Sequence, residues 1–253
     1  MRPRGRRVPD GQVQPAALNS AVIGPQPLVR PRRQRHHARV TATAPHALVD
    51  IASELDDEAI HVWHLDYQPA QGRLPLRRTL AAYLGIDADQ VSLLDEEHGR
   101  PHLDPAHGAA LDFNWSHSGG HALIAVARGV WPGVDVERRR PQSRALPLAR
   151  RFFDGDEADT LAALPAEARD LAFLELWTAK EAVLKAHGRG IGYGLQRLRI
   201  VNTDARLRLL WFDGEDVDAW QLQRLAIAPE LVAALAWRGP PRKIRLERLA
   251  STG

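Results

Sequence analysis

The pentapeptide GVDVE, residues 133–137, constrains this chain more than any other stretch. Val134 and Val136 favour a buried strand, in which successive side chains point to opposite faces. Asp135 and Glu137 then share one face, with Cβ atoms roughly 7 Å apart. At an effective dielectric constant near 20 their charges would repel by about 2 kcal/mol. The pattern therefore indicates either a cation between the carboxylates, or an exposed face on which water or Arg138–Arg140 offset the charges.

The residue types exclude several classes of protein. The 253 residues include no cysteine, which rules out a disulfide framework, a thiolate zinc site and a cysteine nucleophile. The absence of cysteine favours the cytoplasm as the compartment. Because no run of about eighteen apolar residues occurs, we expect no transmembrane helix. The 44% hydrophobic and 26% charged residues are ordinary for a globular protein.

The basic residues are concentrated at the start of the chain. Residues 1–45 hold nine arginines and a single acid, Asp10, so their formal charge is +8. Because the whole chain has a formal charge of +3, residues 46–253 carry −5. Abundant proline and weak apolar periodicity predict a disordered arm, or sequence upstream of the true start. A nucleic-acid-binding arm and a transit peptide are weaker alternatives, so we expect neither nucleic acid nor a membrane among the partners.

Beyond the arm, helical and strand patterns interleave without a regular βαβ rhythm, which predicts an α+β fold. Apolar spacing and terminal glycines predict helices at 75–85 and 168–188. Residues 121–129 and 133–137 are expected to pair as a hairpin, and residues 197–213 to form another. The stretch 110–118 is expected to be a short strand that runs into a turn.

Three stretches supply the ingredients of a magnesium–pyrophosphate site. Asp135 and Glu137 offer the carboxylate oxygens that hard divalent cations prefer. Glu181 and Lys185 lie four residues apart in KEAVLK and share a helix face, although such pairs are also common as surface ion pairs. The stretch NWSHSGG, residues 114–120, suits a turn whose donors converge on an anion. Alone, a histidine such as His117 is more often structural.

In this order, the three stretches resemble the motifs of the 4′-phosphopantetheinyl transferases, of the pseudodimeric type that activates surfactin synthetase. FNWSHS resembles the Ser-His-Ser motif of that family, GVDVE its acidic strand, and FLELWTAKEAVLKAHGRGI its Lys-Glu helix ending in glycines. The tripeptide at 99–101 resembles the family's Gly-Lys-Pro turn, with Arg100 in place of lysine. The resemblance extends over roughly residues 60–240.

The resemblance implies the following reaction. Phosphopantetheine passes from coenzyme A to a serine of an apo acyl or peptidyl carrier protein, with magnesium as cofactor and adenosine 3′,5′-bisphosphate as product. The chemistry agrees with this, because attack on a pyrophosphate needs positioning and charge stabilisation more than a catalytic triad.

The resemblance also implies roles for individual residues. Asp135, Glu137 and Glu181 would bind the metal, and Glu181, or water that it orients, would deprotonate the carrier serine. Lys185 and His117 would neutralise phosphate charge, and Ser116 would donate to phosphate. Arg100 and Pro101 would line the adenine side of coenzyme A. Many relatives have a longer basic segment that binds the 3′-phosphate, and Arg73, Arg77 and Arg78 are the residues available in its place.

The family's architecture implies two similar halves with the active site at their junction, at 46–137 and 138–253. Such an internally duplicated enzyme is expected to act as a monomer. The segment 138–151 is rich in arginine and has no acid, which suits an acidic carrier surface. Two alternatives stay open: another magnesium-dependent phosphotransferase, and a relative that binds coenzyme A or a carrier without catalysis.

Overall fold

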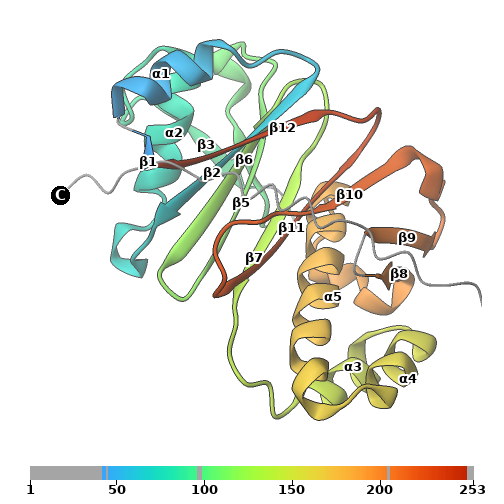
Figure 1. Cartoon of the computed structure of the whole chain (residues 1–253). Helices are drawn as coiled ribbons and strands as arrows, with labels where there is room; N and C mark the ends of the chain where they lie inside the picture. The colour runs from blue at the N-terminus through green and yellow to red at the C-terminus, as the bar shows by residue number, and fades with distance from the viewer. Residues whose placement is uncertain (1–41, 44, 96–98, 204–205, 250–253) are drawn as a thin grey trace, which may run out of the picture. The chain divides into compact units, whose positions relative to one another are not determined.

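The computed structural model describes residues 42–43, 45–95, 99–203 and 206–249 (Figure 1). Helices and strands interleave in it, which confirms the α+β class. The α-helices are α1 (Pro45–Ser53), α2 (Leu74–Leu84), α3 (Ala145–Phe152), α4 (Gly155–Ala163) and α5 (Ala166–His187). Short 3-10 helices are η1 (Pro69–Gln71), η2 (Pro105–His107), η3 (Ile191–Tyr193), η4 (Leu195–Arg197) and η5 (Val217–Ala219).

The strands group into a five-stranded sheet of order β1–β12–β2–β6–β5, a three-stranded sheet of order β10–β11–β7, and the pairs β3–β4 and β8–β9. Their bounds are β1 (Ala42–Thr43), β2 (Ala59–Asp66), β3 (Leu93–Asp95), β4 (Pro101–Leu103), β5 (Asp112–Ser118), β6 (His121–Ala127), β7 (Gly133–Arg138), β8 (Leu198–Asn202), β9 (Leu207–Phe212), β10 (Trp220–Arg224), β11 (Leu231–Arg238) and β12 (Lys243–Leu249).

Strand pairing contradicts one prediction and confirms another. The predicted hairpin of residues 121–129 and 133–137 is wrong, because β6 pairs with β2 and β5 whereas β7 pairs antiparallel with β11. The predicted hairpin within 197–213 is confirmed as β8–β9. Strand β12, near the end of the described chain, pairs parallel with β2. The five-stranded sheet therefore combines strands from both ends of the described chain. The division at residues 137 and 138 stays a prediction.

The predicted arm lies mostly outside the described residues. Its last residues are described in part: Ala42–Thr43 form β1, which pairs with β12, and α1 begins at Pro45. Regular structure therefore starts a few residues earlier than expected. Among the described helices, none combines the length and the apolar character needed to cross a membrane.

A shared apolar cluster holds the two larger sheets together. Ile60 and Leu123 of the five-stranded sheet pack in one buried cluster with Val134, Val136 and Trp237 of the three-stranded sheet. A second cluster fills the space between the five-stranded sheet and α2, and a third lies between α5 and the other face of β11. This packing brings β5, at the edge of one sheet, alongside β7, at the edge of the other (Figure 1).

Helix α5 carries the two site residues of the KEAVLK stretch. Its N-cap is Pro165, whose ring disfavours helical backbone at the residue before it. It ends at Gly188, whose φ of 88° gives the left-handed C-cap. The helix prediction for 168–188 is confirmed within two residues at its start and one at its end. The β7 strand approaches α5 so closely at Gly133 that no side chain fits between them.

We expect Gly133→Ala to lower the free energy of unfolding by about 3 kcal/mol, the upper end of the usual cost of overpacking. A methyl group there would lie 2.0 Å from the Ala182 carbonyl oxygen and 2.3 Å from the Ala186 nitrogen, so backbone must move. Urea denaturation measures the loss. Gly155→Ala is the matched control, because a methyl at that helical position meets nothing within 4 Å. Equal midpoints for Gly133→Ala and wild type would contradict the close approach.

Candidate active site

Side chains, rather than backbone pairing, bridge the seam between β5 and β7. Three residues on one face of β5 reach across it. The side-chain oxygen of Asn114 accepts a hydrogen bond from the Val134 N–H at 2.9 Å. The Ser116 hydroxyl donates to Asp135 Oδ1 at 2.7 Å, and the Ser118 hydroxyl donates to Glu137 Oε2 at 2.8 Å. The seam therefore places a hydroxyl donor beside each carboxylate of the GVDVE strand.

Lys185 supplies the cation that the paired carboxylates require. Its ammonium lies 2.7 Å from Asp135 Oδ1 and 3.8 Å from Glu181 Oε2, and donates to the Val134 carbonyl at 3.2 Å. Asp135 is only 3% exposed. Its Oδ2 atom is buried and has no hydrogen-bond partner among the described residues. One oxygen of this carboxylate is thus satisfied by protein groups, and the other lacks a donor or a cation.

The carboxyl groups of the site influence one another electrostatically. Burial, together with the charges of Asp135 and Glu137, raises the pKa of Glu181 to about 7 against the opposing charge of Lys185. Burial also raises the pKa of Glu137, against the opposing hydrogen bond from Ser118. The cluster holds more potential negative charge than Lys185 alone neutralises, which favours a second cation.

The donor set fits a magnesium ion, although it does not form a complete protein cage. Among the described residues, no three histidine, cysteine, aspartate or glutamate side chains are grouped closely enough to hold a metal by themselves. Magnesium is usually held by one or two carboxylates together with water and substrate phosphates. The unpartnered Asp135 oxygen and the charge coupling among Asp135, Glu137 and Glu181 meet that requirement.

His117 does not lie with the carboxylates. The stretch 112–118 is a strand to its end, and the turn is formed by Gly119 and Gly120, with φ of 55° and 92°. The expected short strand at 110–118 that runs into a turn is confirmed, whereas the interpretation of the whole stretch 114–120 as a turn is wrong. Successive strand residues face opposite sides, so His117 points away from Ser116. It is exposed and stacks on Tyr67 with ring centroids 4.7 Å apart.

Arg100 ties several elements of the site together. Its guanidinium donates to the carbonyl oxygens of Lys185 at 2.5 Å, Phe113 at 3.0 Å and Pro132 at 3.3 Å, and lies 5.2 Å from the Trp131 ring centroid. The next residue, Pro101, is buried at the start of β4. Arg100 thus joins the ends of α5 and β5 in this structure, and contact with adenine stays a prediction.

The three arginines of the first helix region lie in different surroundings. Arg73 precedes α2 and forms an ion pair with Asp95 at 2.6 Å. Arg77 is half-buried, and its Nε atom has no hydrogen-bond partner among the described residues. Arg78 is exposed. Adjacent helical residues diverge by about 100°, so Arg77 and Arg78 do not face one ligand together, and their role toward the 3′-phosphate stays a prediction.

Two bridging residues were missed by sequence reasoning. Asn114 and Ser118 stand two residues on either side of Ser116, which puts all three on one strand face. The strand expected at 110–118 already implies this alternation, but the interpretation of the donors rested on a turn over 114–120 and did not use it. Trp177, four residues before Glu181 on α5, packs against the rings of Phe152, Phe153 and Phe173.

Comparisons with known proteins agree with these motifs. Residues 132–236 match the model of the 4′-phosphopantetheinyl transferase superfamily. The chain is 35% identical over 212 residues to 4′-phosphopantetheinyl transferase HetI of Nostoc sp., covering 81% of this chain and 87% of that protein. It is 34% identical over 124 residues to 4′-phosphopantetheinyl transferase psf-1 of Bacillus pumilus, covering 49% of this chain and 51% of that one.

A solved structure is also similar over part of the chain. The holo-(acyl-carrier-protein) synthase of Bacillus anthracis, in complex with CoA (3′,5′-ADP), aligns with a TM-score of 0.37 and 19% identity. The alignment covers 43% of this chain and 96% of that one.

Proposed function

The chain belongs to the 4′-phosphopantetheinyl transferase superfamily, and on that premise we propose that it transfers phosphopantetheine from coenzyme A to a serine of an apo acyl or peptidyl carrier protein. The observation that carries the proposal is the contact of Ser116 and Lys185 with one carboxylate oxygen of Asp135, while its other oxygen is left unpartnered. This arrangement suits a pyrophosphate bound through a cation.

The reaction forms one bond and breaks one. The carrier serine oxygen bonds to the phosphorus on the pantetheine side of the pyrophosphate, and the bond from that phosphorus to the bridging oxygen breaks. Adenosine 3′,5′-bisphosphate leaves with that oxygen. Negative charge builds on the nonbridging and leaving oxygens, so catalysis rests on positioning and charge stabilisation.

The residues of the seam divide this work. Magnesium held by Asp135, Glu137 and Glu181 would supply positive charge to the pyrophosphate oxygens. The Lys185 ammonium, fixed at the end of α5, offers a second positive charge, and the Ser116 hydroxyl is a further donor. Glu181, directly or through water, accepts the serine proton. Without a metal the pKa of Glu181 is raised to about 7, and a bound cation would lower it and so favour the carboxylate form that accepts a proton.

Both strands of this seam, β5 and β7, belong almost wholly to the first proposed half, 46–137, and helix α5 of the second, 138–253, packs against β7. Ser116 and Ser118 come from the first, and Glu181 and Lys185 come from the second. The pairing of β7 with β11 and of β12 with β2 links the halves on both sides. We retain the expectations of a monomer, of magnesium and of a cytoplasmic location as parts of this proposal.

Intact mass spectrometry of the carrier tests the function. A panel of apo acyl and peptidyl carrier domains is incubated with the protein, coenzyme A and magnesium chloride. We expect at least one carrier to gain the mass of one phosphopantetheine, and the gain to vanish with chelator or when its serine is replaced by alanine. Transfer to water, or turnover of another phosphate ester without carrier modification, would instead favour a different phosphotransferase. Coenzyme A binding without any transfer would favour a non-catalytic relative.

The basic segment after β7 is the proposed carrier-docking surface. Arg144 and Arg150 flank or lie on α3, and both are exposed. We expect the double variant Arg144→Glu/Arg150→Glu to raise the carrier KM about tenfold, because two attractive contacts with an acidic surface become repulsive. The KM for coenzyme A should not change.

Steady-state kinetics at low and high salt measures this effect. Lys243→Glu is the control for an exposed charge reversal, since its side chain is 83% exposed on β12. The difference between the double variant and wild type should shrink at high ionic strength. A change confined to the KM for coenzyme A would assign the two arginines to the coenzyme.

A further inference from the structure

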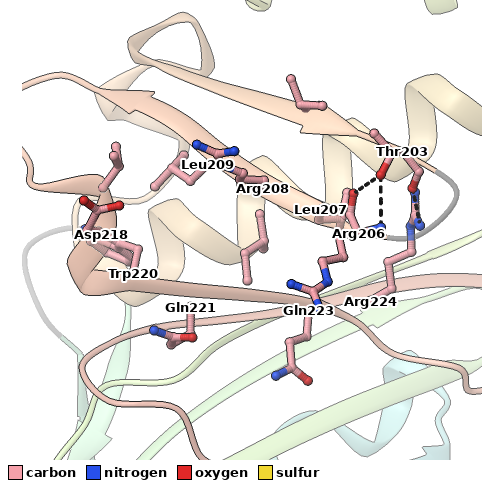
Figure 2. Close-up of a pocket in the computed structure, with 13 residues that line it drawn as sticks. Thr203, Arg206, Leu207, Arg208, Leu209, Asp218, Trp220, Gln221, Gln223 and Arg224 are labelled. Atoms are coloured by element: carbon pink, nitrogen blue, oxygen red, sulfur yellow. Dashed lines mark hydrogen bonds between the residues drawn. The ribbon is translucent and has the colours of Figure 1, made fainter.

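A trough separates the strands β9 and β10 (Figure 2). It has a volume of about 890 Å³ and shares no lining residue with the carboxylate site described above. We call it the β9–β10 trough. Figure 2 shows Asp218 and Trp220 at one end of it and Arg206 and Arg224 at the other.

The walls of the β9–β10 trough are two unpaired strand edges. Among the strands that the structure describes, β9 pairs only with β8, and β10 pairs only with β11. Within the described residues, no backbone hydrogen bond joins β9 to β10. Backbone N–H and C=O groups of the two edges therefore have no backbone partner across the trough, and an unpaired strand edge can take up an extended peptide as an added strand.

Contacts at both ends hold the walls in place. At one end Arg224 donates to the Thr203 carbonyl at 2.9 Å, and Thr203 in turn bonds to Arg206 in three ways, two of them through its hydroxyl (Figure 2). At the other end the rings of Phe212 and Trp220 lie 5.4 Å apart. A trough fixed in this way binds with a smaller loss of conformational freedom than a mobile one.

The side chains around the trough combine apolar and basic character. Val201 and Leu222 line it, and Val201 is 38% exposed although it is apolar. Arg206 and Arg208 line it as well, and neither side chain has an ion-pair partner among the described residues. Among the described residues that line the trough, Asp218 is the only acid. The charge balance therefore favours an acidic ligand with apolar side chains.

We propose that the β9–β10 trough binds an extended acidic peptide segment of a partner protein. The segment lies along the free strand edges, with acidic side chains toward Arg206 and Arg208 and apolar side chains toward Val201 and Leu222. Edge pairing supplies affinity, and the arginines supply the selection for acidic sequence. The site goes beyond the transfer reaction and does not depend on it.

Fluorescence anisotropy with three labelled octapeptides tests the proposal. The first alternates glutamate or aspartate with valine or leucine, the second replaces two of its apolar residues by proline, and the third carries lysine at each acidic position. Because proline has no N–H and resists the strand conformation, the second keeps the charge but loses edge pairing. We expect the second and the third to bind at least about tenfold more weakly than the first. Equal binding of the first two peptides, or no binding of the first, would overturn the proposal.

A charge-reversal variant assigns the binding to the trough. Arg206→Glu/Arg208→Glu should weaken binding of the first peptide at least about tenfold, whereas Lys243→Glu should change it less than twofold. Both side chains are exposed in the wild type, and circular dichroism checks that the fold is kept. Carrier modification by the variant should equal that of wild type, which separates this site from the transferase site. Unchanged peptide binding, or an acidic oligonucleotide bound as tightly as the peptide, would refute a peptide-specific trough.

Discussion

Asp135→Asn is expected to lower the rate of carrier modification on the order of a thousandfold while the fold stays intact. The amide keeps an oxygen that accepts from Ser116, so the bridge across the seam survives. The substitution removes the negative charge of Asp135, which pairs with Lys185 at 2.7 Å and which would hold a magnesium ion. The loss should appear mainly in kcat, because the missing charge acts on the pyrophosphate rather than on carrier docking.

Initial rates over a range of magnesium concentrations measure this effect. Asp213→Asn is the matched control, because that carboxylate is half exposed and pairs with Arg197 outside the seam. It should retain nearly all activity. Activity of Asp135→Asn within tenfold of wild type, with the same magnesium dependence, would refute the assignment of Asp135 to the metal.

The structure reverses the stability argument for removing this carboxylate. From the sequence, two carboxylates on one strand face predict that Asp135→Ala relieves repulsion and leaves metal-free stability level or higher. In the structure the repulsion is already offset by Lys185, and Ser116 depends on the same oxygen. Alanine would leave a half-buried cation and a buried hydroxyl without their partner, so we now expect Asp135→Ala to be less stable than Asp135→Asn.

The parts of the site that follow local rules could be predicted from the sequence. Alternation of Val134, Asp135 and Val136 is a property of one strand, and the spacing of Glu181 and Lys185 is a property of one helix. Both predictions are confirmed by β7 and α5. Gly188 ends α5 as expected, because only glycine readily takes the left-handed conformation there.

The parts that depend on distant pairing could not be predicted. Apolar residues in β6 and β7 fit a hairpin as well as they fit two different sheets, and the true partner of β7 begins at Leu231, nearly a hundred residues later. The local sequence does not identify β5 as the neighbour of β7 either. Side-chain hydrogen bonds, and not backbone strand pairing, join these two strands. The face on which His117 lies depends on whether its segment is a strand or a turn, because side chains alternate along a strand but not through a turn. Its role toward phosphate stays a prediction.

Lys180 shows how one motif mixes chemistry with structure. It precedes Glu181 in KEAVLK but is fully buried on another face of α5. Its ammonium lies 2.6 Å from Glu157 Oε2 and donates to the carbonyl oxygens of Leu195 at 2.9 Å and Leu198 at 2.5 Å. A buried cation with this set of acceptors joins α4, α5 and the start of β8, and so fixes the helix that presents Glu181.

Lys180→Met is accordingly expected to lower the free energy of unfolding by about 3–5 kcal/mol at pH 8, since a buried charge loses its partner. Methionine keeps most of the side-chain volume, so a cavity contributes little to the loss. Chemical denaturation provides the measurement. The double variant Lys180→Met/Glu157→Gln should recover part of the loss, because the amide oxygen still accepts from the Ile200 N–H and no buried charge remains.

The pH dependence distinguishes an unpaired charge from a packing defect. Burial raises the pKa of Glu157, and Lys180 is the largest influence that opposes it. Without Lys180 the pKa of Glu157 in the folded state should rise further above its value in the unfolded chain. The folded variant then binds a proton that the unfolded chain releases, so its stability rises as the pH falls through that folded pKa. The loss of unfolding free energy in Lys180→Met, relative to wild type, should therefore be smaller at pH 5 than at pH 8. In the double variant residue 157 does not titrate, so it should add no pH dependence to the loss. A deficit of the single variant that is the same at both pH values would show that lost packing, and not the uncompensated carboxylate, is the cause.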